Sequence, residues 1–551
     1  MGHRNPISVL RTHAVENQPL PLGDYNAFET DAVLRECVRR EGPDWTSAWL
    51  RELGAMTGSA RYFEHGFRAN ENPPVLEAFD RFGRRVDEVR YHPAYHELMS
   101  MAIGHGVHSV AWREEGRGGH LAHIAAMYLI TQPEQGFCCP ITMTHAVIPS
   151  LRHAPDVSAE WEPRVLTNAY DPRCIPATEK DGVTFGMAMT EKQGGSDVRA
   201  NTTRAVPLGG GDEYELTGHK WFCSAPMSDA FLTLAQADEG LTCFLVPRWR
   251  PDGSRNPFLI QRLKNKLGNR SNASSEIEYA ATWARRVGEP GRGVRTIIEM
   301  VQQTRLDAAT APVGMMRQAL VQAMHHVSQR SAFGRRLLDQ PLMRHVLADL
   351  AVECEAATML VMRVARAVDD GHTNDQAGAF ARLATAFTKY WTNKRAPEFA
   401  YECMECLGGG GYVEESNLPR LYREMPVNSI WEGSGNVICL DVLRAMEREP
   451  ETVPALLAEL EQVRGADSRL DAAIDRLKAA LTDTADPQVR ARRLTESMAL
   501  ALQGSLMVRH APAASADAFC ASRLGADHGY VYGTLPPDAD VDGILERVWP
   551  F

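Results

Sequence analysis

One segment of the sequence combines glycines with hydroxyl groups in a pattern that suits an anion or a flat ring. Within the run 187–198, Thr190 is followed by Gly194, Gly195 and Ser196. Glycines allow backbone amides to approach a ligand closely, and the two hydroxyl groups can form hydrogen bonds. A simple turn joining two strands remains the alternative when this segment is taken alone.

A second segment places a carboxylate between an aromatic residue and a glycine. Glu432 follows Trp431 and precedes Gly433, while Ser434 and Asn436 stand at the expected start of a helix. An apolar wall raises a carboxyl pKa by removing water, and free amides at a helix start favour an anion. In isolation, a solvated loop carboxylate is the common alternative.

Three further segments carry aromatic, basic or glycine-rich groups. They are Gly218–Ser224, which contains Trp221 and Phe222, Arg330–Gly334, and Leu407–Tyr412. Each has an ordinary alternative when read alone, as strand packing, a solvated arginine or a loop. Their order along the chain therefore matters more than any one of them.

The β-forming elements that would position these groups are concentrated in residues 181–290. Six short runs rich in strand-forming residues occur there, separated by turns such as Leu208–Asp212 and Pro251–Gly253. Strands without intervening amphipathic helices favour an antiparallel barrel or sandwich. We expect a separate middle β-domain.

Helical periodicity dominates the rest of the chain. We expect a mostly helical domain over 1–180, a four-helix bundle over 291–444 and an extra helical segment over 445–551. Within the bundle, one helix covers 295–332 and another runs from Pro341 to Gly371, with Asp375 capping a third. The fold class is thus α+β and mostly helical.

Composition excludes several classes of protein. The 551 residues include 59 Lys plus Arg and 70 Asp plus Glu, a formal net charge of −11, and 44% are hydrophobic. These are values of an ordinary folded protein, and the acidic total disfavours a simple nucleic-acid binder. No apolar run is long enough for a membrane span, and no secretory signal is evident, so we expect a cytoplasmic protein without a membrane partner.

The remaining candidate groups predict little chemistry. Eleven cysteines form no disulfide framework, and the Cys403–Cys406 pair lacks a second ligand pair, so we predict no metal site. Ser150, His153 and Asp156 could suggest a triad, but no nucleophile elbow accompanies them.

Together, the five segments resemble the acyl-CoA dehydrogenase family, with the similarity running in order from about 181 to 444. The chain is most similar to the AidB-type alkylation-response branch of this family. The similarity lies in the motifs MTEKQGGSDV and SIWEGSGN and in the extra C-terminal segment. The resemblance implies FAD, bound between the β-domain and the bundle, and a homotetramer in which neighbouring subunits share each flavin site. The residues it implies for FAD are Met187, Met189, Thr190, Gly194, Gly195, Ser196, Phe222, Ser224, Arg330, Phe333, Gln340, Gly408, Gly409, Ile430, Ser434 and Asn436.

The resemblance also implies the reaction. Family members remove the α-proton of an acyl-CoA-like substrate with a carboxylate while hydride leaves the β-carbon for the flavin N5, and a separate electron-acceptor flavoprotein then takes the electrons. The base would be Glu432. At the family's second position for this base, the chain has Thr304, before Arg305, which cannot serve, and Asp307 lies elsewhere on that helix.

Two other functions stay open. Relatives in the AidB-type branch protect against alkylation damage and bind double-stranded DNA through their C-terminal domain, with little dehydrogenase turnover. Residues 445–551, however, carry 11 Lys plus Arg against 17 Asp plus Glu, a net charge of −6. The arginines that could contact DNA are Arg444, Arg490, Arg492, Arg493 and Arg509. A flavin oxidase of a non-thioester, such as a nitroalkane, is the other alternative.

Overall fold

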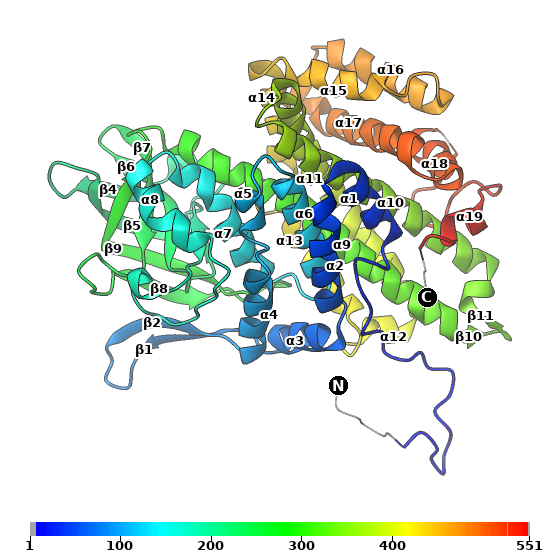
Figure 1. The fold of residues 1–551 in the computed structure, drawn as a ribbon, viewed down its shortest axis with the longest axis horizontal. Helices are drawn as coiled ribbons and strands as arrows, with labels where there is room; N and C mark the ends of the chain where they lie inside the picture. Colours follow the sequence, from blue (N-terminus) through cyan, green and yellow to red (C-terminus); the bar gives the residue numbers. More distant parts are fainter. Residues whose placement is uncertain (1–6, 526, 549–551) are drawn as a thin grey trace. The chain divides into compact units, whose positions relative to one another are not determined.

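The computed structural model describes residues 7–525 and 527–548, and it divides the chain into two compact units. The first unit comprises residues 1–64, 116–133 and 308–551, and the second comprises 65–115 and 134–307. Figure 1 colours the chain along its sequence and labels the helices and strands of each unit.

The second unit contains a sheet of seven strands. Their order is β3-β6-β4-β5-β9-β7, with β8 paired to β9, and a further pairing of β6 with β7 closes the sheet into a barrel. The strands are β3 (Phe185–Ala188), β4 (Arg204–Pro207), β5 (Glu213–Ser224), β6 (Ala230–Ala237), β7 (Gly240–Pro247), β8 (Phe258–Leu263) and β9 (Ser274–Val287).

Most strand pairs are antiparallel, as predicted, and two pairs correct the prediction. β5, β7, β8 and β9 pair antiparallel, but β3 and β4 both pair with β6 in parallel. The chain must cross over to make such pairs, and the short η2 turn (Val198–Ala200) lies on that path between β3 and β4. β4 itself was absent from the predicted strands.

Helices cover one side of this barrel and complete its core. Trp161 of α8 packs edge-on against Phe185 of β3, with ring centroids 5.3 Å apart, inside a cluster of buried apolar side chains. The helices of this unit are α4 (Pro93–Gly104), α5 (Val110–Arg113), α7 (Cys138–Leu151) and α8 (Pro155–Val165). A hairpin of β1 (Val75–Phe79) and β2 (Arg85–Arg90) interrupts the predicted helical region.

The first unit is built around a bundle of long helices. Its four members are α9 (Gly293–Gln329, of which residues 308–329 belong to this unit), α10 (Pro341–Asp370), α11 (Asp375–Cys406) and α14 (Gly435–Arg448). α9 continues through Pro312. The cap of α11 is Asn374 rather than the predicted Asp375, because the Asn374 side chain accepts from the Gln376 and Ala377 amides.

Shorter helices surround the bundle in the first unit. They are α1 (Ala32–Glu41), α2 (Asp44–Thr57), α6 (Gly119–Ile130), α12 (Gly409–Tyr412) and α13 (Leu418–Asn428), and α3 (Ala60–Glu71) begins in this unit. The C-terminal segment adds α15 (Thr452–Glu461), α16 (Ser468–Thr482), α17 (Pro487–His510), α18 (Ala513–Phe519) and α19 (Val541–Leu545).

A buried ionic network ties the C-terminal segment to the bundle. Arg523 pairs with Asp349 and Glu353 of α10, and Arg395 of α11 pairs with Glu353 at 3.1 Å. Burial acts to raise the pKa of Glu353, but the two arginines outweigh it and lower that pKa. The segment is therefore part of the packed unit rather than a loose appendage. Among the described residues, no helix is long and apolar enough to cross a membrane.

Candidate functional site

The glycine-containing segment after β3 is anchored by a buried ion pair. The Lys220 ammonium of β5 lies 2.9 Å from the Glu191 carboxylate, and both side chains have no exposed surface. Glu191 also accepts hydrogen bonds from the amides and hydroxyls of Thr202 and Thr203. Burial acts to raise the pKa of Glu191, but Lys220 and these hydrogen bonds lower it to about 2. The segment is thus held rigidly at its base.

The two glycines of this segment leave a cradle beside Thr190. Gly194 has a φ of +137°, and a Cβ at that position would meet no atom within 4 Å. At Gly195, a Cβ would lie 2.4 Å from the Thr190 Oγ1. Only glycine therefore keeps this hydroxyl accessible, and the exposed Ser196 follows directly.

The end of β5 presents an aromatic ring beside the same segment. The Trp221 amide donates to the Thr190 carbonyl at 2.8 Å, and the next residue, Phe222, is 47% exposed. The Ser224 and Ser274 hydroxyls lie 3.3 Å apart. Met187 and Met189 pack their half-buried side chains on the apolar cluster of this unit. All eight predicted flavin residues from Met187 to Ser224 thus lie on β3, β5 or the segment between β3 and β4.

Glu432 lies in the first unit, in the short connection between α13 and α14. Its backbone φ is +56°, the left-handed region that non-glycine residues seldom adopt, and Gly433 follows with a φ of +99°. The Trp431 indole donates to the Asn428 side chain at 3.0 Å. The connection is therefore a tight turn that presents Glu432 just before a helix N-terminus.

The start of α14 carries the two predicted flavin residues that follow Glu432. Ser434 is the N-cap but makes no side-chain capping bond, and the Asn436 side chain accepts from Arg492 of α17 at 2.8 Å. Ile430, on the other side of Glu432, is 67% exposed. The α14 amides thus remain available to a ligand, and the C-terminal segment reaches this turn.

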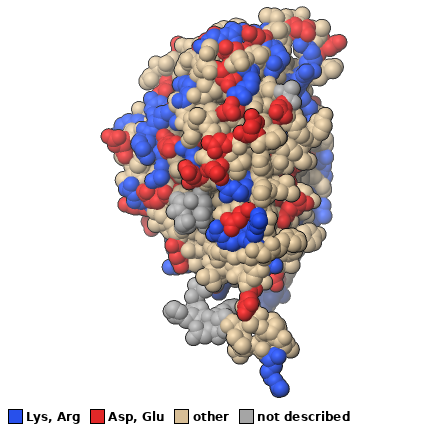
Figure 2. Space-filling model, turned by 90° about the vertical axis from the view of Figure 1, so that its right-hand side faces the viewer, with Lys and Arg blue, Asp and Glu red and all other residues tan. Residues whose placement is uncertain are grey.

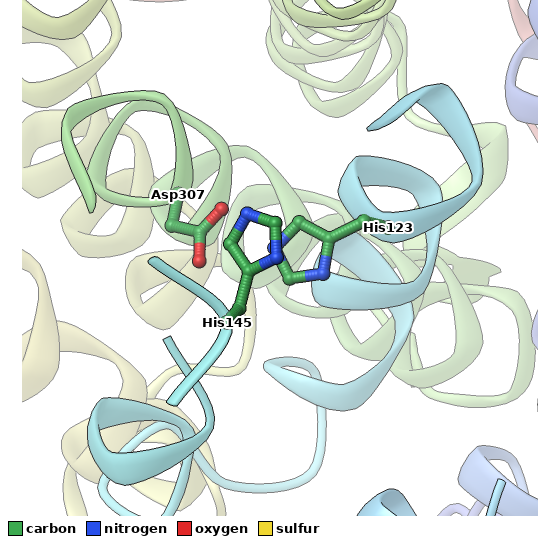
Figure 3. A group of neighbouring side chains, drawn as sticks. All are labelled: His123, His145 and Asp307. Carbon is green, nitrogen blue, oxygen red and sulfur yellow. The ribbon is translucent and has the colours of Figure 1, made fainter. Parts of the chain in front are cut away.

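The alternative position for the base holds no carboxylate, as predicted. Thr304 is buried, and its hydroxyl donates to the Val301 carbonyl at 3.0 Å. Asp307 of α9 is buried and faces His145 of α7 (Figure 3). A carboxylate oxygen of Asp307 and a ring nitrogen of His145 lie within 4.8 Å of each other. His123, the third residue labelled there, belongs to α6 of the first unit.

The residues expected to reach a neighbouring subunit lie on two turns of the first unit. Phe333 is 98% exposed at the tip of the hairpin formed by β10 (Ser331–Ala332) and β11 (Arg335–Arg336). Arg330 donates to the Asn17 carbonyl at 2.8 Å, and Gln340 donates to the Ala332 carbonyl at 3.2 Å. A second turn holds Gly408, with a φ of +58°, and Gly409, both exposed with open space around them.

The arginines considered for DNA contact are mostly engaged within the protein. Arg490 donates to the Ala485 carbonyl at 2.8 Å, Arg509 pairs with Glu459 at 2.8 Å and Arg444 with Asp441 at 3.3 Å. Arg492 holds Asn436, and Arg493 is exposed on α17. Figure 2 views the side of Figure 1 on which α18, α19, β10 and β11 are labelled, and acidic and basic side chains are interspersed over it.

The apparent triad does not exist. The Ser150 hydroxyl donates to the Thr296 carbonyl at 2.8 Å, His153 pairs with Glu299 at 2.8 Å, and Asp156 pairs with Arg285. Each residue has its own partner, so no proton relay joins them. Cys403 and Cys406 are buried and free.

The sequence analysis did not single out three buried residues that support these segments, Glu191, Lys220 and Lys389. Glu191 and Lys220 anchor the segment after β3 that carries Thr190 and Gly195, and Lys389 of α11 contacts the Glu432 turn. Lys220 is an even number of residues from the buried Tyr214 and Leu216 on β5. Because side chains alternate between the two faces of a strand, this spacing was a signal that Lys220 is buried as well. No comparable signal marks Lys389, because α11 is buried on most of its faces.

Comparison with known families places three consecutive matches on the chain. Residues 17–172 match the N-terminal domain of the adaptive response protein AidB, 186–282 the acyl-CoA dehydrogenase middle domain, and 291–447 the acyl-CoA dehydrogenase C-terminal domain. The AidB protein of Escherichia coli K12 is 45% identical over 521 residues, covering 94% of this chain and 96% of that protein.

Solved structures give the same picture. The Caenorhabditis elegans protein ACDH-11, in complex with C11-CoA, superposes with a TM-score of 0.84 at 27% identity, covering 98% of this chain and 95% of that one. The apo form of Bd2924 gives a TM-score of 0.81 at 29% identity, covering 90% of this chain and 99% of that one. Acyl-CoA dehydrogenase family member 11 of C. elegans is 29% identical, over 94% of this chain and 88% of that protein.

Proposed function

The chain belongs to the acyl-CoA dehydrogenase family, in its AidB branch, and from that premise we propose that it is an FAD-dependent oxidoreductase acting on an acyl-CoA-like thioester. The observation that carries the proposal is the Glu432 turn. A half-buried carboxylate stands in a constrained left-handed turn beside Trp431 and directly before the α14 N-terminus. A carboxylate held in a fixed turn can be placed within reach of a substrate proton, which general-base catalysis requires.

The residues of the second unit fit FAD. The open space at Gly194, the Thr190 hydroxyl kept clear by Gly195 and the exposed Phe222 ring offer hydrogen bonds and an aromatic surface to a flat, polar-edged ring. Thr190, Ser196 and Ser224 would hold the ring and its chain. On the first unit, the proposed FAD residues are Ser434 and Asn436. When bound, FAD supplies the acceptor for the hydride that leaves the β-carbon.

Glu432 performs the proton transfer in this proposal. Its carboxylate takes the α-proton of the thioester, the α C–H electron pair forms the new C=C bond, and the carboxyl group becomes neutral until it returns the proton to solvent. Thr304 has no part in this transfer, because a hydroxyl is far too weak a base.

The hairpin tip supports the proposal that a second copy completes each flavin site. Phe333 is 98% exposed at the hairpin tip, and Arg330 stands at the base of the same hairpin. We propose that this hairpin and the Gly408–Gly409 turn reach the FAD of a neighbouring subunit in a homotetramer, and that a separate flavoprotein accepts the electrons.

Anaerobic reduction of the bound flavin tests this function. The purified holoprotein is mixed with acyl-CoA thioesters of different chain length, and the loss of flavin absorbance is followed. We expect at least one thioester to bleach the flavin. Bleaching by a nitroalkane or another non-thioester alone would instead support the flavin oxidase alternative and refute the proposal.

A further inference from the structure

A buried ammonium group bridges the two carbonyl groups on either side of Glu432. Lys389 of α11 is 1% exposed, and its Nζ donates to the Trp431 carbonyl at 2.8 Å and to the Gly433 carbonyl at 2.5 Å. One cation therefore holds the residues that immediately precede and follow the proposed base. Charge-assisted bonds of this length are stronger than those between neutral groups.

The backbone of the turn explains why such a bridge is needed. Glu432 and Gly433 both have positive φ values, +56° and +99°, so the chain reverses within two residues. A non-glycine residue persists in this region only when its surroundings impose it. The two bonds from Lys389 fix the peptide group that precedes Glu432 and the one that follows Gly433, and so they hold the turn from which the Glu432 side chain leaves the backbone.

The same face of α11 is itself anchored. Asn393, one helical turn after Lys389, donates to the Ala308 carbonyl of α9 at 2.9 Å and accepts from the Ser429 hydroxyl through its carbonyl at 3.0 Å. The neighbouring Thr392 hydroxyl donates to the Ala309 carbonyl at 2.9 Å. The cation thus projects from a helix that is locked against α9, which makes it a rigid reference for the turn.

A buried charge is a costly way to hold a turn, since an amide or hydroxyl donor would cost less desolvation. What an ammonium group adds is a fixed positive charge beside the residue that must be an anion to act as a base. We propose that Lys389 is the positioning residue for Glu432: it holds the turn in its left-handed form and directs the carboxylate toward the α-carbon of the substrate. This inference rests on the proposed function of Glu432.

Two measurements on the holoprotein test it, with Lys389→Met as the variant and Lys478→Met as the control. Lys478 is a half-buried lysine of α16 whose side chain pairs with Glu461. The first measurement is hydrogen exchange of the peptides that cover residues 429–436. We expect at least a roughly tenfold increase in exchange rate in Lys389→Met and no change in Lys478→Met. Unchanged exchange in Lys389→Met would overturn the inference.

The second measurement separates chemistry from binding. In Lys389→Met, the limiting rate of flavin reduction by the best thioester should fall about 100-fold while the substrate dissociation constant stays within about threefold, as expected for a misplaced reacting group. Lys389→Arg should recover part of the rate. Faster exchange with an unchanged reduction rate would also overturn the inference.

Proton removal can be observed without hydride transfer. The α-proton of acetoacetyl-CoA is acidic because two carbonyl groups activate it, and its enolate has a distinct ultraviolet absorbance. We expect less enolate on Lys389→Met than on the wild type at equal saturation, and equal amounts would contradict a positioning role. If Lys389→Met does not fold, Lys389→Gln replaces it under the same criteria.

The outcomes distinguish this inference from the proposed function. If the wild-type protein is reduced by no thioester, the proposed function fails, and hydrogen exchange still decides whether Lys389 holds the turn. If the wild-type protein is reduced but Lys389→Met behaves like it in exchange and rate, the proposed function stands and the inference fails.

Discussion

The Lys220 ammonium and the Glu191 carboxylate lie 2.9 Å apart with no exposed surface, and together they hold the segment that carries Thr190 and Gly195. Replacing Glu191 with Gln would leave the buried ammonium without its counter-charge. We expect the free energy of unfolding to fall by about 3–5 kcal/mol, measured by urea denaturation. The control is Glu239→Gln at an exposed turn, where a loss as large as in Glu191→Gln would refute the special role of the pair.

The same pair predicts how stability depends on pH. The pKa of Glu191 lies near 2 in the folded protein against an ordinary 4.5, so its contribution is fully present above pH 4.5 and is lost as the pH falls toward 2. The stability difference between the wild type and Glu191→Gln should therefore shrink over that interval. Denaturation curves from pH 6 to pH 3 check this, and a difference that stays constant or grows toward low pH would contradict it.

Gly195 is the most restrictive position in the proposed flavin cradle. A Cβ there would lie 2.4 Å from the Thr190 Oγ1, so Gly195→Ala must displace this hydroxyl. We expect the affinity for FAD to fall about tenfold or more, equivalent to about 1.4 kcal/mol, while the melting temperature of the apoprotein changes little. Gly210→Ala, in open space on the loop after β4, is the control and should bind FAD normally. Normal affinity in Gly195→Ala would remove Thr190 from the site.

Arg523 connects the C-terminal segment to the bundle through Asp349 and Glu353 of α10. Arg523→Met would leave the buried Asp349 without its cation, while Glu353 would keep Arg395. We expect a loss of about 3–5 kcal/mol in unfolding free energy and faster proteolysis of residues 511–548. Arg493→Met, at an exposed position on α17, should change neither quantity. Equal protease resistance in both variants would show that other contacts hold the segment.

Binding to double-stranded DNA should be weak. Residues 445–551 have a net charge of −6, and four of the five candidate arginines already have partners within the protein. Few phosphates could then be neutralised, so the salt dependence of binding should be shallow. Fluorescence anisotropy with a labelled duplex at 50 and 200 mM salt measures it. Tight binding that weakens about 1,000-fold between these concentrations would support a DNA-binding function.

Much of the fold could be predicted because its signals are local. Pro341 and Gly371 bracket α10, and Gly435 starts α14, as the start and stop residues indicated. The β1–β2 hairpin was missed because its strands are short and lack a clean apolar alternation, with the charged Asp87 buried in β2. The parallel pairs of β6 were missed because pairing partners depend on how the whole barrel closes, which no local pattern encodes.

The site was predictable in its parts but not in its supports. Glu432, Thr190 and the glycines are recognisable by type and spacing, since close approach to a ligand demands them. Lys389 is not, because a lysine in a sequence usually lies at the surface, and for Lys220 only the strand alternation of β5 gives a signal. Their role appears only when the structure shows which carbonyl and carboxylate groups surround them.

Glu432→Gln tests the central claim most directly. The substitution removes the base but keeps the size of the side chain, and Lys389 can still hold the carbonyls of Trp431 and Gly433. The variant should fold, bind FAD and bind the thioester as the wild type does. The rate of anaerobic flavin reduction by that thioester should fall by at least about 10²–10⁴-fold. Reduction at the wild-type rate would show that another group removes the α-proton.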